Sequence, residues 1–378
     1  MTKSNTDYKI VHLTKLPAPY RLPLFERINQ QPGIELVVVY LTDSQPNRFW
    51  QVDIGGRTFR EILLSGIQFF VPALEWPIHL TRGVFAHLCR ERPDAVVVTG
   101  YESLAFWQAL LYCKLTRCRF VLWSGATLNR LRHNHGLVQM LRSLFLRNAD
   151  GFLAYGTRSR EFLEHWGVPV SRIHVGYNTV DMEFWARSGL NSEIGSQEID
   201  RRMLRLLYVG LLIPLKRVDQ ILQALSLLTD LPIEMTIIGE GRERARLEEM
   251  AHQLELKNIK FLGFKQYDEL PPYYRQADAF VFPSKRDIWG LVVNEALASG
   301  LPVICSELVG ACPDLLDSSN SVLFNPHDVS SLVEAIREFY ERRREFRTNR
   351  RQISEQACRR ASLDQYAQAF IKAATYRD

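Results

Sequence analysis

The sequence predicts an α/β protein built from two Rossmann-like, doubly wound domains. Its 378 residues exceed what a single hydrophobic core usually organises and are enough for two. In both halves short apolar segments alternate with amphipathic ones, which is typical of parallel strands joined by crossover helices. With 46% hydrophobic and 24% charged residues, the composition is that of a folded globular protein rather than of a disordered or fibrous chain.

The predicted strands divide into two sets, each interleaved with predicted helices. The strands of the first set are residues 9–14, 34–41, 94–100, 119–123 and 151–156, and those of the second set are 204–210, 233–239, 259–263, 279–284 and 301–306. Between the sets, residues 186–203 lack the regular apolar segments and are rich in glycine, serine and charged residues, which indicates a linker. We therefore expect an N-terminal domain over 1–185, this linker, a C-terminal domain over 204–363 and a C-terminal helix over 364–378 that packs back toward the N-terminal domain.

Charge and cysteine content exclude some classes of protein. The net charge of +5 is small beside 47 basic and 42 acidic residues, so nucleic acid is not an expected partner. The six cysteines show no CxxC spacing and are interpreted as reduced core residues. The apolar run at the start is short and is followed by Pro17 and Pro19, unlike a signal sequence, and no later run reaches the length of a membrane span. A cytoplasmic protein is expected.

Residues 281–306 carry the most informative pattern. A strand is expected to end near Phe282 and a helix to run from about 290 to 299, where Gly300 supplies a left-handed stop. The backbone amides at the start of that helix, those of Gly290, Leu291 and Val292, have no carbonyl partner within the helix. Such a helix start binds phosphate oxygens through its dipole and its free amides, so a diphosphate is the expected occupant.

Two acids lie on this segment. Glu295, about one and a half turns into the helix, is placed to accept hydrogen bonds from two hydroxyl groups, such as those of a ribose, and Asp287 precedes the helix. In the alternative interpretation, Asp287 caps the helix and Glu295 lies on an exposed face.

The stretch 283–304, PSKRDIWGLVVNEALASGLPVI, resembles the E-x7-E segment of the family 4 retaining glycosyltransferases. These enzymes have the glycosyltransferase-B (GT-B) fold, in which two Rossmann-like domains face each other across a cleft. The resemblance covers nearly the whole chain in collinear order. It includes residues 15–28, 152–181, 208–225, 237–251, 261–284 and 309–316.

The resemblance implies roles for both acids and for a lysine. Glu295 corresponds to the acid that holds the donor ribose, and Asp287 to the acid near the transferred sugar, where the family usually has glutamate. The stretch from Gly210 to Lys216 corresponds to a loop whose basic residues hold the diphosphate and balance charge as the leaving group departs. Lys216 matches this pattern, whereas the usual first basic residue is Leu211 here, which makes Arg217 a candidate replacement.

Further donor contacts are implied in the loops after other strands. Gly239 and Glu240 are expected to border the nucleotide, Gly263 and Phe264 to offer backbone contacts to the base, and Ser284 to line the donor site. The glycines of IIGEGRER do not form a dinucleotide fingerprint, because that motif needs a small residue where Arg244 stands. A simple tight turn is the alternative.

The N-terminal domain is expected to bind the acceptor through Tyr20, Arg21 and Ser124. A purely structural role for Arg21 is the alternative. Many relatives have a histidine near the position of Ser124, and the nearby His133 and His135 lie in a polar stretch that does not favour a catalytic role.

These features predict a retaining, hexosyltransferase-type enzyme that uses a nucleotide sugar as substrate and needs no cofactor. The acceptor is expected to be a glycan or a lipid-linked molecule, in cell-surface polysaccharide or glycoconjugate synthesis. The chain contains no DxD motif, so no metal ion is expected. Lys216 and the helix dipole are expected to neutralise the diphosphate in place of a metal ion. The alternatives are a catalytically degenerate nucleotide-sugar-binding subunit and a GT-B epimerase or inverting transferase.

Residues 136–149 have apolar side chains at helical spacing, from Leu137 to Phe145, flanked by Arg142 and Arg147. A basic amphipathic helix of this kind can lie on an anionic membrane, which suggests peripheral contact at the cytoplasmic face. The alternative is a helix that covers the sheet of the N-terminal domain.

Overall fold

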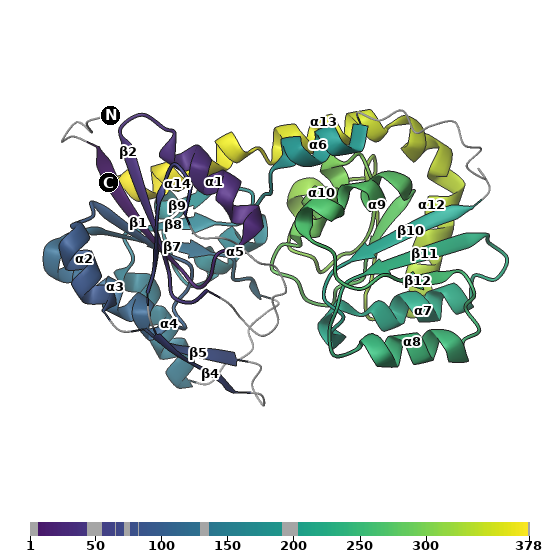
Figure 1. Ribbon diagram of the computed structural model, residues 1–378, viewed down its shortest axis with the longest axis horizontal. Helices are drawn as coiled ribbons and strands as arrows, with labels where there is room; N and C mark the ends of the chain where they lie inside the picture. Colours follow the sequence, from purple (N-terminus) through teal and green to yellow (C-terminus); the bar gives the residue numbers. More distant parts are fainter. Residues whose placement is uncertain are drawn as a thin grey trace. The chain divides into compact units, whose positions relative to one another are not determined.

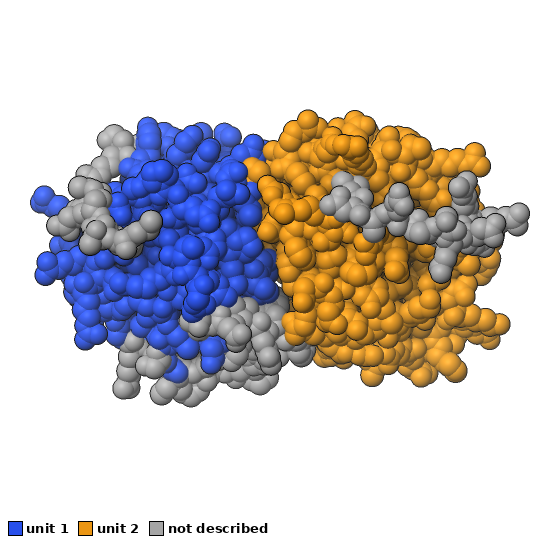
Figure 2. Space-filling view, turned by 45° about the horizontal axis from the view of Figure 1, so that its top comes forward, with its two compact units in different colours: residues 1–178, 363–378 blue, residues 179–362 orange. Residues whose placement is uncertain are grey.

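The computed structural model describes residues 7–43, 55–64, 66–71, 76–81, 83–128, 136–190 and 203–376. The chain forms two compact units, coloured separately in Figure 2. Unit 1 comprises residues 1–178 and 363–378, and unit 2 comprises residues 179–362.

Unit 1 is built on a parallel sheet with the strand order β3-β2-β1-β6-β7-β8-β9. These strands are β1 (Tyr8–Thr14), β2 (Ile34–Tyr40), β3 (Arg60–Leu63), β6 (Ala95–Val98), β7 (Arg119–Ser124), β8 (Gly151–Ala154) and β9 (Ile173–Val175). A separate antiparallel hairpin consists of β4 (Gly66–Val71) and β5 (Trp76–Thr81). The order reverses between β1 and β6, and ligands of open α/β sheets bind outside the carboxyl ends of strands at such a switch point.

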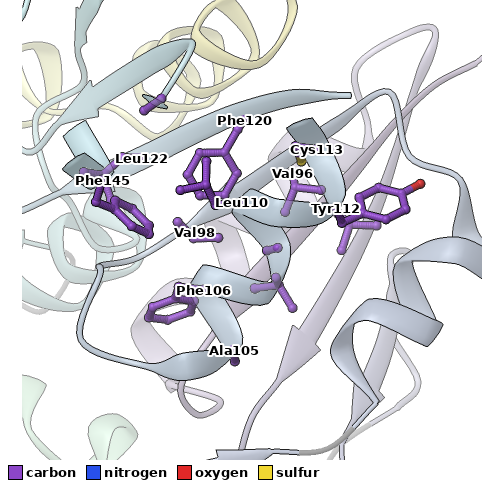
Figure 3. Close-up of a cluster of buried hydrophobic side chains, with 14 of the residues drawn as sticks. Val96, Val98, Ala105, Phe106, Leu110, Tyr112, Cys113, Phe120, Leu122 and Phe145 are labelled. Atoms are coloured by element: carbon purple, nitrogen blue, oxygen red, sulfur yellow. The ribbon is translucent and has the colours of Figure 1, made fainter. Parts of the chain in front are cut away.

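Helices cover both faces of this sheet (Figure 1). The helices of unit 1 are α1 (Leu22–Asn29), α2 (Val84–Glu91), α3 (Leu104–Thr116), α4 (Gly136–Asn148), α5 (Thr157–His165) and α14 (Leu363–Thr375). On one face, side chains of α2, α3, α4 and α5 form a core with alternate residues of the strands. Figure 3 shows Phe106 and Leu110 of α3 and Phe145 of α4 directed toward Val96 and Val98 of β6.

The other face is covered by α1 and by the C-terminal helix α14. Phe370 of α14 is fully buried there, and Trp123 of β7 donates a hydrogen bond from Nε1 to the Tyr366 hydroxyl at 2.7 Å. The last helix of the chain is therefore part of the core of unit 1.

Unit 2 is built on a second parallel sheet, with the order β12-β11-β10-β13-β14-β15. Its strands are β10 (Leu204–Val209), β11 (Ile233–Ile238), β12 (Ile259–Phe261), β13 (Ala279–Phe282), β14 (Val303–Ser306) and β15 (Ser321–Phe324). Its helices are α6 (Met182–Leu190), α7 (Val218–Ser226), α8 (Arg244–Gln253), α9 (Pro271–Gln276), α10 (Leu291–Ala298), α11 (Cys312–Leu315), α12 (Val329–Thr348) and α13 (Arg350–Arg360). The sequence prediction of two parallel, doubly wound α/β domains is confirmed.

The division between the units falls at 178/179 and 362/363, whereas the sequence pattern placed the linker at 186–203. Residues 186–190 belong to α6, and 191–202 lie outside the described residues. Trp185 anchors α6 in unit 2, because its fully buried ring contacts the rings of Tyr267 and Tyr274 and its Nε1 donates to the Tyr267 hydroxyl at 2.6 Å.

None of the helices in the described ranges is both long enough and apolar enough to cross a membrane.

Candidate functional site

The loops at the carboxyl ends of the unit 2 strands form one hydrogen-bonded surface. The amide of Gly210, which follows β10, donates to the carbonyl of Ile238, the last residue of β11, at 3.0 Å. The amide of Gly239 donates to the Gly263 carbonyl at 2.8 Å. On the β13 side of β10, the backbone amide of Lys285 donates a hydrogen bond to the Leu215 carbonyl at 3.0 Å. Since β12, β11, β10 and β13 are neighbours in that order, the sheet brings together loops that are far apart in sequence.

Two glycines allow these loops to approach each other. A Cβ atom at Gly239 would lie 1.8 Å from the carbonyl oxygen of Gly210, and one at Gly241 would lie 2.2 Å from that of Leu212. Any side chain at either position would have to move backbone atoms. The glycines that the sequence placed near a nucleotide are thus required by the packing of loop against loop.

The start of α10 faces the same edge of the sheet. Gly290 is its N-cap, with φ of 91°, and no side chain caps the helix. By helix geometry, the amides of Gly290, Leu291 and Val292 have no carbonyl one turn back. This arrangement offers several N–H donors and the positive end of the helix dipole to an anion.

Lys216 and Asp287 form an ion pair at this edge. Lys216 ends the short 3-10 helix η5 (Pro214–Lys216), Asp287 lies in the loop before α10, and Lys216 Nζ contacts Asp287 Oδ2. Both side chains are largely but not fully buried, at 19% and 16% exposure. The Lys216 ammonium also lies 5.0 Å from the centre of the Phe282 ring. The structure therefore brings together two residues predicted to act on the donor.

Asp287 is held firmly by its own loop. Its Oδ1 accepts the amide of Trp289 at 3.3 Å, and its carbonyl accepts the amide of Gly310 at 3.2 Å. A Cβ atom at Gly310 would lie 1.8 Å from the Ile288 carbonyl oxygen, so the loop after β14 packs directly on the loop that carries Asp287. This packing fixes the acid close to the start of α10.

Glu295 is buried inside α10, with 7% exposure. The Tyr274 hydroxyl, on α9, donates to Glu295 Oε2 at 2.8 Å. Burial raises the pKa of Glu295 to about 8, even though the hydrogen bond from Tyr274 acts in the opposite direction. The alternative interpretation of Glu295 as an exposed helix residue is therefore wrong, because its carboxylate is buried and hydrogen-bonded to Tyr274.

Other residues implied in donor binding are engaged elsewhere. Ser284 is fully buried, with its hydroxyl 3.4 Å from the Leu215 carbonyl. The Arg217 guanidinium donates to Asp219 Oδ1 at 3.2 Å and to the Pro326 carbonyl at 3.4 Å.

Glu240 and Phe264 belong to the loops after β11 and β12. Glu240 forms an ion pair with Arg244 at the start of α8, and a Cβ atom at Gly263 would lie 3.2 Å from both of these side chains. Phe264 directly follows Gly263, so the residues that the resemblance assigned to the nucleotide lie close together at one end of the loop surface.

In unit 1, Arg21 lies in an aromatic cage. Its guanidinium carbon is 4.6 Å from the Trp123 ring centre, 5.3 Å from that of Tyr155, 5.6 Å from that of Tyr20 and 5.8 Å from that of Tyr366. Burial acts to lower the pKa of Arg21, but the tyrosines outweigh it and raise the pKa, which keeps the group charged. The structure thus brings Arg21 and Tyr20 together with Trp123.

Ser124 is the last residue of β7 and directly follows Trp123, one of the rings around Arg21. Its hydroxyl accepts the Ala126 amide at 3.3 Å, and its carbonyl accepts the Ser159 hydroxyl at 2.6 Å, so Ser124 shapes the turn that follows β7. His133 and His135 lie outside the described residues.

The sequence analysis missed three residues around these sites. Tyr274 contacts Glu295 from another helix, Tyr366 comes from the far end of the chain, and His12 is buried on β1 with Nδ1 3.1 Å from the Val97 carbonyl. Burial lowers the pKa of His12 to about 3, which keeps its ring neutral. Each looks like an ordinary core residue in sequence, and only the packing of distant segments gives it a polar partner.

Within the described ranges, no group of three or more histidine, cysteine, aspartate or glutamate side chains is arranged to hold a metal ion.

The pKa of Glu295 predicts a measurable pH dependence of stability. Its folded-state pKa of about 8 exceeds the ordinary value of 4.5, so between these values the folded protein holds a proton that the unfolded chain releases. The free energy of unfolding therefore falls with rising pH in this window, by about 1.4 kcal/mol per pH unit for one full proton. Urea unfolding of Glu295→Gln should lack this contribution, and equal slopes for both proteins between pH 5 and 8 would contradict the assignment.

Comparisons with known proteins identify glycosyltransferases as relatives of this chain. Residues 192–360 match the family model described as glycosyl transferases group 1, and residues 30–184 match that of glycosyltransferase family 4. A sulfoquinovosyl transferase of Arabidopsis thaliana is 35% identical over 351 residues, which cover 84% of this chain and 62% of that protein. An uncharacterised glycosyltransferase of Methanocaldococcus jannaschii is 28% identical over 325 residues, 83% of this chain and 76% of its own.

For several other curated relatives the match spans only about half of their length, between 42% and 50%. Among solved structures, an Anabaena protein in complex with UDP has a TM-score of 0.73 at 16% identity and covers 97% of this chain and 98% of its own. That likeness shows the fold, which is GT-B. Since the two family models together account for both units, the chain belongs to the family 4 glycosyltransferases.

Proposed function

We propose that this protein transfers a sugar from a nucleoside diphosphate sugar to a hydroxyl group of a glycan or lipid-linked acceptor, with retention of anomeric configuration. One observation carries the proposal. The open start of α10 and the Lys216 and Asp287 pair lie at the carboxyl edge of the unit 2 sheet, and α10 itself carries the buried Glu295. The structural relative from Anabaena binds UDP and UDP-glucose, which supports a uridine nucleotide as the first donor to test.

In this proposal the diphosphate binds at the start of α10, where the amides of Gly290, Leu291 and Val292 and the Lys216 ammonium neutralise its charge. Asp287 positions Lys216 through their ion pair. When the bond between the sugar and the diphosphate breaks, negative charge grows on the leaving oxygen, and fixed N–H donors and an ammonium stabilise that charge without reorganisation. Arg217 is engaged with Asp219 and Pro326, so this work falls mainly to Lys216 and the helix.

Retention follows if the acceptor hydroxyl enters on the face that the diphosphate leaves and gives its proton to the departing oxygen. A covalent route would instead need two carboxylates about 5 Å apart across the reacting carbon. Asp287 is paired with Lys216, and Glu295 is bonded to Tyr274 and assigned to the ribose, so neither is available as the enzyme nucleophile. We place the reaction at the cytoplasmic face of a membrane, in the synthesis of a surface glycan or glycoconjugate.

The decisive experiment is release of nucleoside diphosphate that depends on an acceptor, with the product anomer assigned by NMR. Lys216→Ala should lower the turnover rate about 10²- to 10³-fold, as removal of a fixed donor to a developing oxyanion does. Lys285→Ala, at an exposed lysine of the neighbouring loop after β13, is the matched control and should retain the wild-type rate. Donor binding without turnover would instead support a degenerate binding subunit, and an inverted product would exclude retention.

Donor affinity should depend on pH through Glu295. Ribose hydroxyls donate to an ionised carboxylate, so a proton on Glu295 competes with the donor. The association constant should rise by up to about tenfold per pH unit as the pH approaches the pKa of about 8, with release of a proton. Titration calorimetry in two buffers measures both quantities. Glu295→Gln should bind about 1 to 3 kcal/mol more weakly and without this pH dependence, and unchanged affinity would remove the assigned role.

We further propose that transfer needs no metal ion, because Lys216 and the helix dipole neutralise the diphosphate. The rate in excess chelator should equal the rate without it. A rate that is lost in chelator and restored by magnesium or manganese would overturn this part of the proposal, while the assigned donor site would stand.

A further inference from the structure

Tyr274 places its hydroxyl group against the carboxylate of Glu295. Its side chain is fully buried, on the short helix α9, and its Oη donates to Glu295 Oε2 at 2.8 Å. A phenylalanine would fill almost the same space, and burying a hydroxyl group costs free energy unless the group has a hydrogen-bond partner. The hydrogen bond to Glu295, and not the packing of α9, therefore accounts for a tyrosine at this position.

Neighbouring side chains hold this hydroxyl in place. The Tyr274 ring packs against the Trp185 ring, with 5.0 Å between centres, and against the Phe280 ring at 5.6 Å. Trp185 belongs to α6, which packs against both α9 and α10 (Figure 1). At the end of α9, the Arg350 guanidinium donates to the Ala277 carbonyl at 3.1 Å and to the Tyr274 carbonyl at 3.4 Å. Because both the ring and its helix are held, the hydroxyl has a fixed position.

Tyr274 is the donor in its contact with Glu295. Burial and the charge of Glu295 both raise the pKa of the Tyr274 hydroxyl, so the hydroxyl keeps its proton. A second tyrosine, Tyr267 of η6 (Tyr267–Glu269), lies near Glu295, and the same two causes raise its pKa. The Tyr267 hydroxyl accepts Trp185 Nε1 at 2.6 Å. The two phenols therefore face the carboxylate as neutral groups.

The carboxylate of Glu295 can bind Tyr274 and a ligand at the same time. An ionised carboxylate has about four acceptor positions on its two oxygens, and Tyr274 occupies one of them, on Oε2. Two neighbouring hydroxyl groups of a ribose need two more. A hydrogen bond from a fixed donor restricts rotation of the carboxylate, so the remaining acceptor positions keep one orientation before the ligand arrives.

We propose that Tyr274 is a positioning residue of the donor site, which holds Oε2 of Glu295 and so presents the carboxylate, ionised and in one orientation, to the ribose hydroxyls of the nucleotide sugar. Tyr274 acts only through Glu295 and does not itself touch the donor. The inference rests on the proposed function, because it requires the ribose role of Glu295, and it extends the donor site to a second helix.

Tyr274→Phe tests the hydrogen bond, because it removes the hydroxyl and keeps the ring. At about pH 7.5 the KM for the donor should rise about tenfold, whereas kcat at saturating donor should stay within about twofold of the wild type. Tyr273→Phe, at the partly exposed tyrosine next to it on α9, is the matched control and should behave like the wild type. Thermal unfolding checks that both variants are folded, which is expected because each keeps its ring.

The pH dependence of donor binding gives a second measurement. The hydrogen bond from Tyr274 acts to lower the pKa of Glu295. Its loss should therefore shift the rise of the donor association constant to higher pH, and part of the affinity lost in Tyr274→Phe should return as the pH is raised. A loss of packing alone would not move this profile. Wild-type donor affinity in Tyr274→Phe, or a loss confined to kcat, would overturn the proposal.

A double-mutant cycle shows whether Tyr274 acts through Glu295. In the Glu295→Gln background, Tyr274→Phe should weaken donor binding by no more than about twofold further. A second full loss of about tenfold would mean that Tyr274 contributes independently of Glu295, and the proposal would fall.

A titration without donor separates this inference from the proposed function. Carbon-13 NMR follows the glutamate carboxyl groups, and Glu295 is assigned by the loss of its signal in Glu295→Gln. Its midpoint should lie at about pH 8 in the wild type and at higher pH in Tyr274→Phe. Equal midpoints would overturn the inference and leave the proposed function standing. Wild-type donor affinity in Glu295→Gln would instead remove the ribose role, and the role of Tyr274 with it.

Discussion

The close contact between the backbones of neighbouring loops in unit 2 is the constraint on which its site depends. Parallel strands β11, β10 and β13 lie side by side and end at the same edge, so their loops must share a narrow strip of space. Glycine allows this close approach at two positions. A Cβ atom at Gly239 would lie 1.8 Å from the Gly210 carbonyl oxygen, and a Cβ atom at Gly310 would lie 1.8 Å from the Ile288 carbonyl oxygen. Because the loops touch through backbone atoms, the positions of Lys216, Asp287 and the start of α10 are set by the sheet and not by flexible side chains.

The two acids of this site, eight positions apart, have opposite electrostatic surroundings. Asp287 is paired with Lys216, so its charge is compensated. Glu295 accepts a hydrogen bond from the Tyr274 hydroxyl but sits in a buried position, so its ionised form is disfavoured and its pKa rises to about 8. Burial disfavours the charged form of a carboxyl group. A ligand that donates hydrogen bonds would add further partners for the Glu295 carboxylate.

Local patterns were enough to predict much of unit 2. The run of apolar residues up to Phe282, followed by Gly290 and Gly300, predicted the strand and the helix, because these signals act within a few residues of one another. The same reasoning could not predict that Tyr274 contacts Glu295 or that Arg217 turns to Asp219 and Pro326. Those contacts join segments whose separation in space depends on how helices pack, and a single sequence carries no local signal for that.

Helix α4 shows why an amphipathic pattern alone does not fix which side of a helix is buried. The sequence suggested one apolar stripe from Leu137 to Phe145 with arginines beside it. The structure splits that stripe, since Phe145 packs against Trp107 while Met140 and Leu144 are exposed. Arg142 can occupy the inner side because Tyr101 accepts its hydrogen bond and Trp166 covers its guanidinium. Both aromatic residues lie outside α4, so the outward turn of its leucines follows from neighbours that no periodicity within the helix records.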